Sequence, residues 1–314
     1  MSKGRRDAKK DKNLPVPRTT LRINTPQPGI LLPIPPLARY LTFSLEPGVS
    51  PREPLRELRD VADGERVVAG IGVSLALALG RSIEGLRAFP SHTGAGFDVP
   101  STPSALWIWV RGEDRGELFH RSRLIERTLA RAFQLEQALD AFRHHRGRDL
   151  TGYEDGTENP RGRRARMAAV VQAPSRLAGS SFVAVQQWEH RFGRFEAMTP
   201  RQRDDAIGRR RSSNEEIDNA PPSAHVKRTA QENFEPAAFV VRRSMPWADA
   251  MRAGLVFVAF GCSLDAFEAQ LRRMVGLDDG ITDALFKFTR PVTGAYYWCP
   301  GMRRGRLDFA PLGL

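Results

Sequence analysis

The sequence predicts an α+β fold built from two similar halves, each with an antiparallel sheet. Three observations predict it: an ordinary globular composition, the order of strand-like and helix-like segments, and the return of a similar order after residue 150. The chain has 314 residues, of which 41% are hydrophobic, so wholesale disorder is excluded. This length permits one large domain or two domains of about 150 residues each.

The first half follows the order strand, helix, strand, strand, helix, strand, which is the split βαβ or ferredoxin-like pattern. Alternating apolar residues predict the strands, and apolar residues at helical spacing predict the helices. Gly70 and Gly72 could divide the second strand into two pieces. The predicted segments, in chain order, are 40–45, 51–61, 67–77, 105–110, 117–133 and 134–142.

The second half repeats a similar mixture after a loop. Its last helix is predicted to begin with Ser263 as N-cap, because serine is favoured there, and Phe267 and Leu271 share one apolar face. The predicted strands are 181–189, 239–245, 255–260 and 293–298, and the predicted helices are 200–207 and 263–275.

Residues 1–37 are predicted to form a basic, proline-rich, extended tail. Residues 1–39 carry nine Lys and Arg against two acids, so they hold +7 of the chain's +12. Seven of the 23 prolines lie between Pro15 and Pro36, and proline removes a backbone donor and fixes φ, which excludes a regular helix or a central strand. The tail is expected to be solvated; a weak contact with nucleic acid or an anionic surface is the alternative.

Several protein classes do not fit the composition. The longest apolar stretch, 67–79, is well below the ~20 residues that cross a bilayer. No secretory signal is found, and no apolar core follows Arg5 and Arg6, so we expect a cytoplasmic protein. Two cysteines, Cys262 and Cys299, exclude a disulfide scaffold and a cysteine-rich zinc module.

The loop at 150–160, LTGYEDGTENP, is the first of three stretches that carry polar chemistry. Gly152 and Gly156 bracket Glu154 and Asp155, and Pro160 ends the loop. A rigid loop of this kind can hold one carboxylate at a fixed place. The alternative is a tight turn with solvated acids.

The other two stretches are 221–229, PPSAHVKRT, and 239–246, FVVRRSMP. A neutral imidazole at His225 could bind a metal ion, or His225 could be a structural residue. Arg242 and Arg243 are consecutive on a predicted strand, so their side chains point to opposite faces. The inward guanidinium needs a partner, since an unpaired buried charge is costly; an ion pair with a nearby acid is the simplest one.

Taken together, these stretches resemble the dye-decolourising peroxidases, a haem-dependent family, and most closely its shorter bacterial P-type members. The matching residues follow the family's order over most of 40–300, and the basic tail is additional to the usual pattern. They are GYEDGTENP at 152–160, WEH at 188–190, IGR at 207–209, NEEID at 214–218, SAH at 223–225, RRS at 242–244 and FTRPVTG at 288–294.

The resemblance implies tandem ferredoxin-like domains with haem b in the C-terminal half. The expected parts are a tail at 1–37, an N-terminal domain at 38–150 and a haem-binding domain at 151–314. It also implies reduction of hydrogen peroxide and oxidation of dyes, phenols or other one-electron donors through a ferryl intermediate. The alternative is haem binding, storage or delivery without turnover, which would not require a distal acid.

By position in the family's motifs, His225 would be the proximal iron ligand, Asp155 the distal acid and Arg242 the distal arginine. Asp155 would accept and return the peroxide proton, and Arg242 would stabilise the developing negative charge. The cofactor-binding residues implied besides His225 are Ser244 in the distal pocket, Arg209 and Arg228 at the haem propionates, Asp283 at the proximal imidazole, and Thr157 and Asn159 in the glycine-rich loop.

The sequence around Asp283 and around His225 allows a different local arrangement from the one that the resemblance implies. The segment around Asp283, DDGITDALFKF, also fits an amphipathic helix with Asp283 facing solvent. Ala224 stands directly before His225, where a serine is common in the family, although Ser223 is one residue away.

The resemblance implies hydrogen peroxide and a small reducing substrate as partners, and a homo-oligomer. Bulky reductants cannot enter a small distal pocket, so electrons would pass through aromatic residues, which could equally be core. The candidates are Trp188, Trp247, Tyr296, Tyr297 and Trp298. Arginine clusters lie at 161–166, 209–211 and 303–306, so nucleic-acid binding is a weaker alternative function. No nucleic-acid-binding motif accompanies these clusters. The sequence makes no prediction about packaging in a protein nanocompartment.

Overall fold

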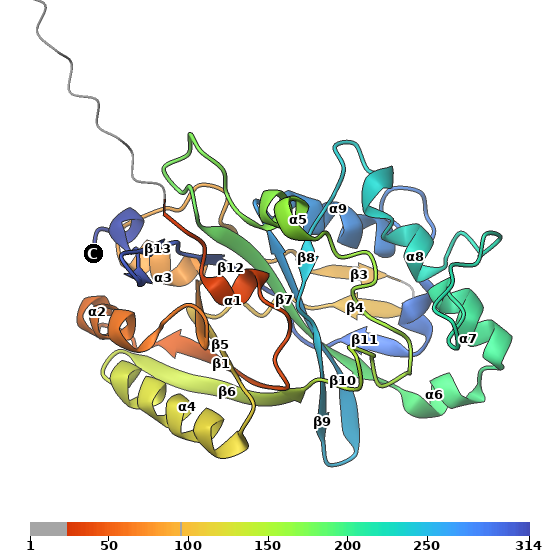
Figure 1. Ribbon diagram of the computed structural model, residues 1–314, viewed down its shortest axis with the longest axis horizontal. Coiled ribbons are helices and arrows are strands. Elements are labelled where there is room, and N and C mark those ends of the chain that lie inside the picture. Colours follow the sequence, from red (N-terminus) through yellow and green to blue (C-terminus); the bar gives the residue numbers. More distant parts are fainter. Residues whose placement is uncertain (1–23, 95) are drawn as a thin grey trace, which may run out of the picture.

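One continuous antiparallel sheet forms the centre of the computed structural model, which describes residues 24–94 and 96–314 (Figure 1). Its main strands run in the order β6-β1-β5-β2-β12-β7-β10-β8. The first half supplies β1 Leu37–Leu45, β2 Val67–Ile71, β5 Leu106–Gly112 and β6 Phe133–Phe142. The second half supplies β7 Ser181–His190, β8 Val241–Arg242, β10 Arg252–Gly261 and β12 Ala295–Cys299.

The two halves repeat the same strand order. In each half the fourth strand lies beside the first, and the third lies between the first and the second. The halves join where β2 pairs with β12, with Trp298 opposite Ile71. The predicted α+β fold with duplicated ferredoxin-like units is therefore confirmed, and the two sheets are fused into one.

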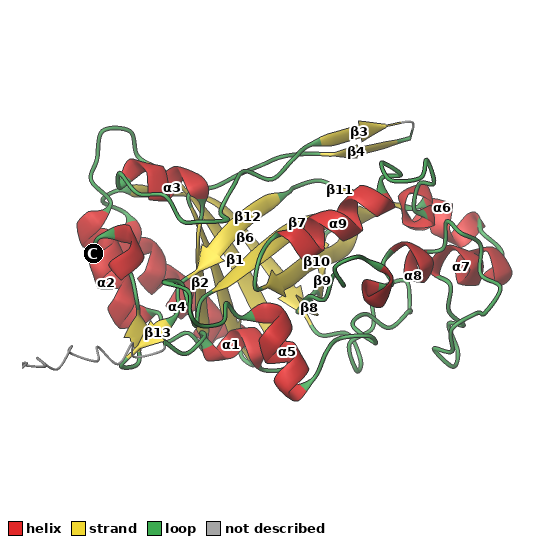
Figure 2. Cartoon of the chain, turned by 90° about the horizontal axis from the view of Figure 1, so that it is seen from above, coloured by secondary structure: helices red, strands yellow, loops and turns green. Residues whose placement is uncertain are grey.

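Helices cover both faces of the sheet, and the alternation of the strands explains the two cores. In β5, Leu106 and Ile108 face one core, whereas Trp107 and Trp109 face the other. Helices α2 Arg52–Val61, α3 Val73–Ala78, α4 Arg115–Leu129 and α9 Asp265–Met274 cover the first face. Helices α1 Pro28–Leu31 and α5 Gly162–Ala169 lie against the second face, on the side away from α9 (Figure 2).

Shorter elements complete the described chain, and none of its helices is long and apolar enough to cross a membrane. The helices are α6 Phe192–Ala197, α7 Pro200–Ile207 and α8 His225–Arg228, with short 3-10 turns at Gln231–Asn233, Ala284–Lys287 and Ala310–Leu312. The strands are β3 His92–Gly94, β4 Phe97–Val99, β9 Met245–Asp249, β11 Thr289–Pro291, β13 Met302–Arg303 and β14 Arg306–Leu307.

Three predicted elements differ in the structure. The strand expected at 67–77 ends at Ile71, and α3 follows with Gly72 as its N-cap. Gly72 passes so close to the Ser104 carbonyl that no side chain would fit there. The strand expected at 239–245 is divided into β8 and the start of β9. The last long helix has Leu264 at its N-cap, while the Ser263 hydroxyl accepts a hydrogen bond from the Asp265 amide at 3.2 Å.

The N-terminal segment 24–36 packs onto the fold, so the predicted solvated, extended tail is wrong from residue 24 onward. Ile30 is fully buried, and Pro28 begins the one-turn helix α1, where its missing N–H is no loss. Gln27, also fully buried, donates to the carbonyls of Ala69 and Pro300 and accepts from the Ala69 amide at 2.8 Å. The remaining part of the predicted tail, 1–23, lies outside the described residues.

The two arginines of the pair have different partners: Arg242 pairs with an acid, Asp155, as expected, whereas Arg243 donates to carbonyls. It donates to the Leu31 carbonyl at 2.8 Å and to the Arg242 carbonyl at 3.0 Å. Arg111 lies close by and donates to the carbonyls of Pro33 and Glu65. Burial, together with the charge of Arg111, lowers the pKa of Arg243 to about 10.

Replacing Gln27 with alanine is expected to lower the free energy of unfolding by about 1–3 kcal/mol, because the Ala69 amide and two carbonyls lose their buried partner. Urea unfolding measures the change. Gln134→Ala, at an exposed strand position, is the matched control and should change stability by less than about 0.5 kcal/mol. Equal stability of the two variants would contradict the structural role of the N-terminal segment.

Candidate active site

A largely apolar cavity lies in the C-terminal half, between β7, β10, α8, α9 and the loop 147–160. Together with the open space at its entrance it encloses about 900 Å³. Its apolar lining comprises Trp188, Ile207, Leu255, Phe257, Phe267, Leu271, Met274, Leu285 and Phe288. A polar space, here called the mouth, adjoins the cavity and shares Glu154, Asp155, His225 and Arg242 with it.

His225 is the first residue of α8 and lines both the cavity and the mouth. Its Nδ1 lies 2.8 Å from Oδ2 of Asp283, which is 2% exposed. The other Asp283 oxygen accepts from the Leu285 amide at 2.8 Å. Asp283 is therefore a buried partner of the imidazole and not a solvent-facing helix residue. With Nδ1 engaged, Nε2 is the nitrogen that remains for a metal.

Asp155 and Arg242 meet on the same cavity, with Nη1 of Arg242 3.5 Å from Oδ1 of Asp155. The Asp155 amide donates to the Gly147 carbonyl at 3.2 Å, which holds the loop across its base. Gly152 and Gly156 have φ values of 90° and 74°, which side-chain-bearing residues rarely adopt. The glycines thus allow the sharp path that brings the Asp155 carboxylate to the guanidinium.

Asn159 ties this loop to the strand that carries Arg242. Its Nδ2 donates to the Arg242 carbonyl at 3.0 Å, and its Oδ1 accepts from the Arg242 amide at 2.8 Å. One carboxamide therefore pairs with the backbone of Arg242 in both directions. This contact gives Asn159, which the sequence predicted as a cofactor-binding residue, a positioning function.

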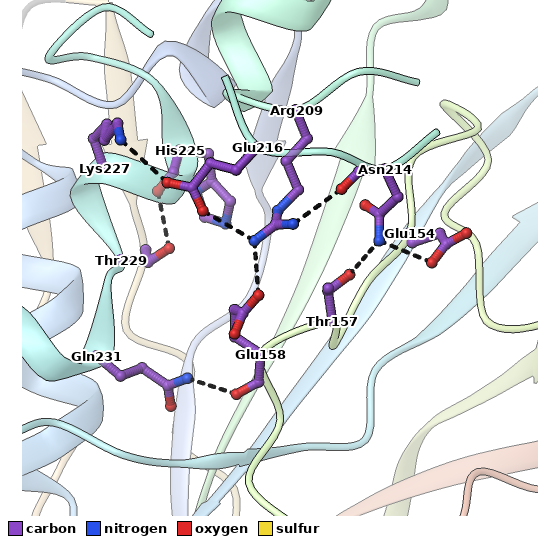
Figure 3. A network of polar contacts seen from close by, with 10 residues as sticks. All are labelled: Glu154, Thr157, Glu158, Arg209, Asn214, Glu216, His225, Lys227, Thr229 and Gln231. Atoms are coloured by element: carbon purple, nitrogen blue, oxygen red, sulfur yellow. Dashed lines mark hydrogen bonds and ion pairs between the residues drawn. The ribbon is translucent and has the colours of Figure 1, made fainter. Parts of the chain in front are cut away.

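Polar contacts also organise the mouth (Figure 3). Asn214 donates to Thr157 and to Glu154, each at 3.0 Å. Arg209 forms ion pairs with Glu158 at 2.8 Å and with Glu216 at 3.1 Å. Thr157 and Arg209, both predicted cofactor-binding residues, therefore line the mouth rather than the apolar cavity.

Arg228 and Ser244, the other two predicted cofactor-binding residues, line neither the cavity nor its mouth as these are formed by the described residues. Arg228 is buried and donates to both oxygens of Asp279 at 2.7 Å and to the Arg273 carbonyl. Its guanidinium is thus committed to a structural pair, and it holds the pKa of Asp279 down at about 2. Ser244 is buried with its hydroxyl unpaired among the described atoms.

Asp149 and His190 form a buried pair on the cavity wall. The sequence predicted no role for this pair. Nε2 of His190 lies 2.9 Å from the Asp149 carboxylate, and its Nδ1 lies 2.8 Å from the Thr289 hydroxyl. Burial alone would raise the pKa of Asp149, but the bond and charge of His190 and the bonds from Thr151 hold it below its ordinary value. His190 was visible only as part of the triplet at 188–190, and nothing in the sequence pairs it with Asp149.

Gln186 places an unpaired hydrogen-bond donor on the cavity wall. Its side-chain oxygen accepts from the Trp188 indole at 3.3 Å. Its Nε2 is buried and has no acceptor within the described part of the chain. Buried donors are rarely left unpaired, so this cavity fits a bound group that carries an acceptor. A mostly apolar cofactor with a few polar atoms, held by His225, fits the chemistry of this lining.

The five aromatic residues predicted as candidates for electron transfer lie around the sheet. Trp188 lines the cavity, and its carbonyl accepts from the Trp247 indole at 2.9 Å. Tyr296 and Trp298 belong to the core under α9, whereas Tyr297 belongs to the core on the opposite face.

The chain is similar to known proteins over most of its length. The family model for "Dyp-type peroxidase, C-terminal" matches residues 146–304. The dye-decolorizing peroxidase of Rhodococcus erythropolis is 28% identical over 299 residues, which cover 88% of this chain and 86% of that protein. A putative dyp-type peroxidase from Shewanella oneidensis has a TM-score of 0.82 at 25% identity, covering 89% of this chain and 97% of its own. A variant of Rhodococcus jostii DypB in complex with heme has a TM-score of 0.78 at 23% identity, covering 88% of this chain and 96% of its own.

Asp149→Asn is expected to destabilise the protein near pH 7 by about 1–3 kcal/mol, because it weakens the buried contacts with His190 and Thr151. The folded-state pKa of Asp149 lies below the ordinary 3.8. Its contribution is therefore present above pH 3.8 and is lost as the pH falls through the folded-state pKa. Urea unfolding across pH measures this. The exposed control Asp218→Asn should show no pH-dependent difference in stability from wild type. If the stability difference between Asp149→Asn and wild type stayed constant down to pH 2, the lowered pKa of Asp149 would be contradicted.

Proposed function

The chain belongs to the Dyp-type peroxidase family and is a haem peroxidase, and we propose that its cavity holds haem b through His225 and cleaves hydrogen peroxide beside Asp155 and Arg242. The observation that carries this proposal is the convergence of two pairs, His225 with Asp283 and Asp155 with Arg242, on one cavity. An imidazole can hold the iron, a carboxylate can accept and return a proton, and a guanidinium can stabilise negative charge, so these two pairs together can serve peroxide cleavage.

His225 would bind the iron through Nε2, while Asp283 accepts the hydrogen bond from Nδ1. A carboxylate in this place fixes the tautomer and makes the imidazole a stronger ligand. When bound, the haem supplies an open iron position for peroxide and the redox capacity of the reaction. The spacing of the two cysteines supports a non-covalently bound haem such as haem b. Cys262 and Cys299 cannot form the Cys-x-x-Cys-His pattern that attaches haem covalently.

Asp155 would take the proton from the inner oxygen of hydrogen peroxide and return it to the outer oxygen, which then leaves as water. Arg242 would stabilise the negative charge that develops on the separating oxygens. Its Nη1 lies 3.5 Å from the Asp155 carboxylate, so both groups can contact the same substrate molecule. Asn159 keeps the Asp155 loop next to Arg242 through its two hydrogen bonds with the Arg242 backbone.

Arg209 is the residue we propose for a haem propionate, because it lies at the mouth and carries a planar, bidentate donor. It would exchange at least one of its bonds to Glu158 and Glu216 for that contact. Dyes are proposed as reductants because the relative from Rhodococcus erythropolis is named a dye-decolorizing peroxidase. Phenols and other one-electron donors are proposed with them. A cytoplasmic location and a homo-oligomeric state remain part of the proposal.

Asp155→Ala and Arg242→Leu should each retain haem and slow the reaction with hydrogen peroxide by about 10²–10⁴-fold, since one removes the proton acceptor and the other the stabilising charge. Rapid mixing with peroxide, followed by the visible absorption spectrum, measures the rate. Arg115→Leu, at a largely exposed side chain, is the control and should react like wild type. Unchanged rates in both site variants would rule out these roles.

His225→Ala should lose the proximal ligand and retain much less haem after purification and desalting. The ratio of haem absorbance to protein measures retention, and the position of the haem band reports the ligand. His120→Ala, which alters an exposed histidine on α4, is expected to match wild type. Full retention with the wild-type spectrum in His225→Ala would refute the assignment.

A further inference from the structure

A second pocket lies directly behind the cavity, on the opposite face of the same strands. In β7, Gln186 and Trp188 line the cavity, whereas Val185 and Gln187 line this rear pocket. In β10, Val256 lines the rear pocket and both its neighbours line the cavity. Because successive side chains of a strand point to opposite faces, one layer of sheet separates the two spaces.

Three stacked rings form one wall of the rear pocket. Trp107 lies between Tyr40 and Tyr297, with ring centroids 6.1 Å and 5.9 Å apart and planes within 17° and 18°. The Tyr297 hydroxyl is paired with Ser104 at 2.6 Å. The pocket, with its mouth, encloses about 660 Å³. This wall suits a flat aromatic ring, since offset stacking adds ~0.5–1.5 kcal/mol per ring pair.

The rear pocket also has two unused donors. The Tyr40 hydroxyl and the Trp107 indole N–H are buried and find no partner among the atoms described. Both side chains line the pocket and are at most 4% exposed. An indole N–H can only donate, and buried donors are rarely left unpaired. An occupant that carries an acceptor oxygen would satisfy them.

Charge narrows the class of occupant. Among the described residues that line the rear pocket, Glu136 is a carboxylate, and there is no lysine, arginine or histidine. Nothing there would neutralise an anion, so a negatively charged ring is disfavoured. A neutral phenol with a hydroxyl or methoxy oxygen fits the rings, the donors and the charge together.

We propose that the rear pocket binds a neutral phenol as a reducing substrate; its oxidation, though not its binding, rests on the proposed peroxidase function. Two phenol molecules bind in succession, and each loses one electron and one proton to become a phenoxyl radical. The two electrons cross the sheet to the haem cavity, and the two protons leave to solvent past Glu136, an exposed residue of the rear pocket. Hydrogen peroxide takes up two electrons and two protons and becomes two molecules of water.

The test uses guaiacol (2-methoxyphenol) as the probe and the haem-loaded protein. Val185→Phe and, from the opposite wall, Thr42→Phe fill the rear pocket, and Val49→Phe makes the same change at an exposed site. Calorimetric titration should show guaiacol bound to wild type and to Val49→Phe, and at least about tenfold weaker binding in both filling variants. The second filling variant keeps the test valid if one of the two fails to fold.

Turnover separates binding from oxidation. The filling variants should lower kcat/KM for guaiacol about tenfold, while the rapid-mixing rate with peroxide stays at the wild-type value. Guaiacol affinity that survives both fillings would overturn the site, and lost affinity with unchanged kcat/KM would overturn the reductant role. A protein that binds guaiacol but does not react with peroxide would instead contradict the proposed function.

Discussion

Every strand of the central sheet must place successive side chains on opposite faces, and this constraint organises the whole molecule. In β7 it sends Gln186 and Trp188 to the cavity and Val183 and Val185 to the opposite core. The same alternation in β5 separates two aliphatic side chains from two tryptophans. Because one sheet runs through both halves, a functional space on one face is fixed relative to everything on the other face.

The charged groups of the site are positioned by contacts that do not themselves take part in chemistry. Asn159 joins the loop of Asp155 to the backbone of Arg242, and the buried Asp149–His190 pair anchors the start of the same loop. Asp283 orients His225 from behind. Groups that are held in place before the substrate arrives lose little free energy to reorganisation during the reaction, so these supporting contacts pre-organise the site.

The sequence predicted those features that are encoded locally. Alternation located most strands, and the motif residues identified His225, Asp155, Arg242 and Asp283 through their resemblance to a family. It failed where the outcome depends on distant partners. The apolar run at 67–77 is ambiguous between strand and helix without its neighbours, and Arg228 appeared free to bind a propionate because its partner Asp279 is 51 residues away.

The N-terminal segment crosses the boundary between the two halves. Gln27 contacts Ala69 in the first half and Pro300 in the second, while the Leu31 carbonyl accepts from Arg243. Prolines suit this bridge, since their carbonyls accept hydrogen bonds without adding donors that need partners. With one strip of chain bonded to both repeats, neither repeat can melt alone without breaking that strip's contacts. These shared contacts favour unfolding of the two repeats as one cooperative unit.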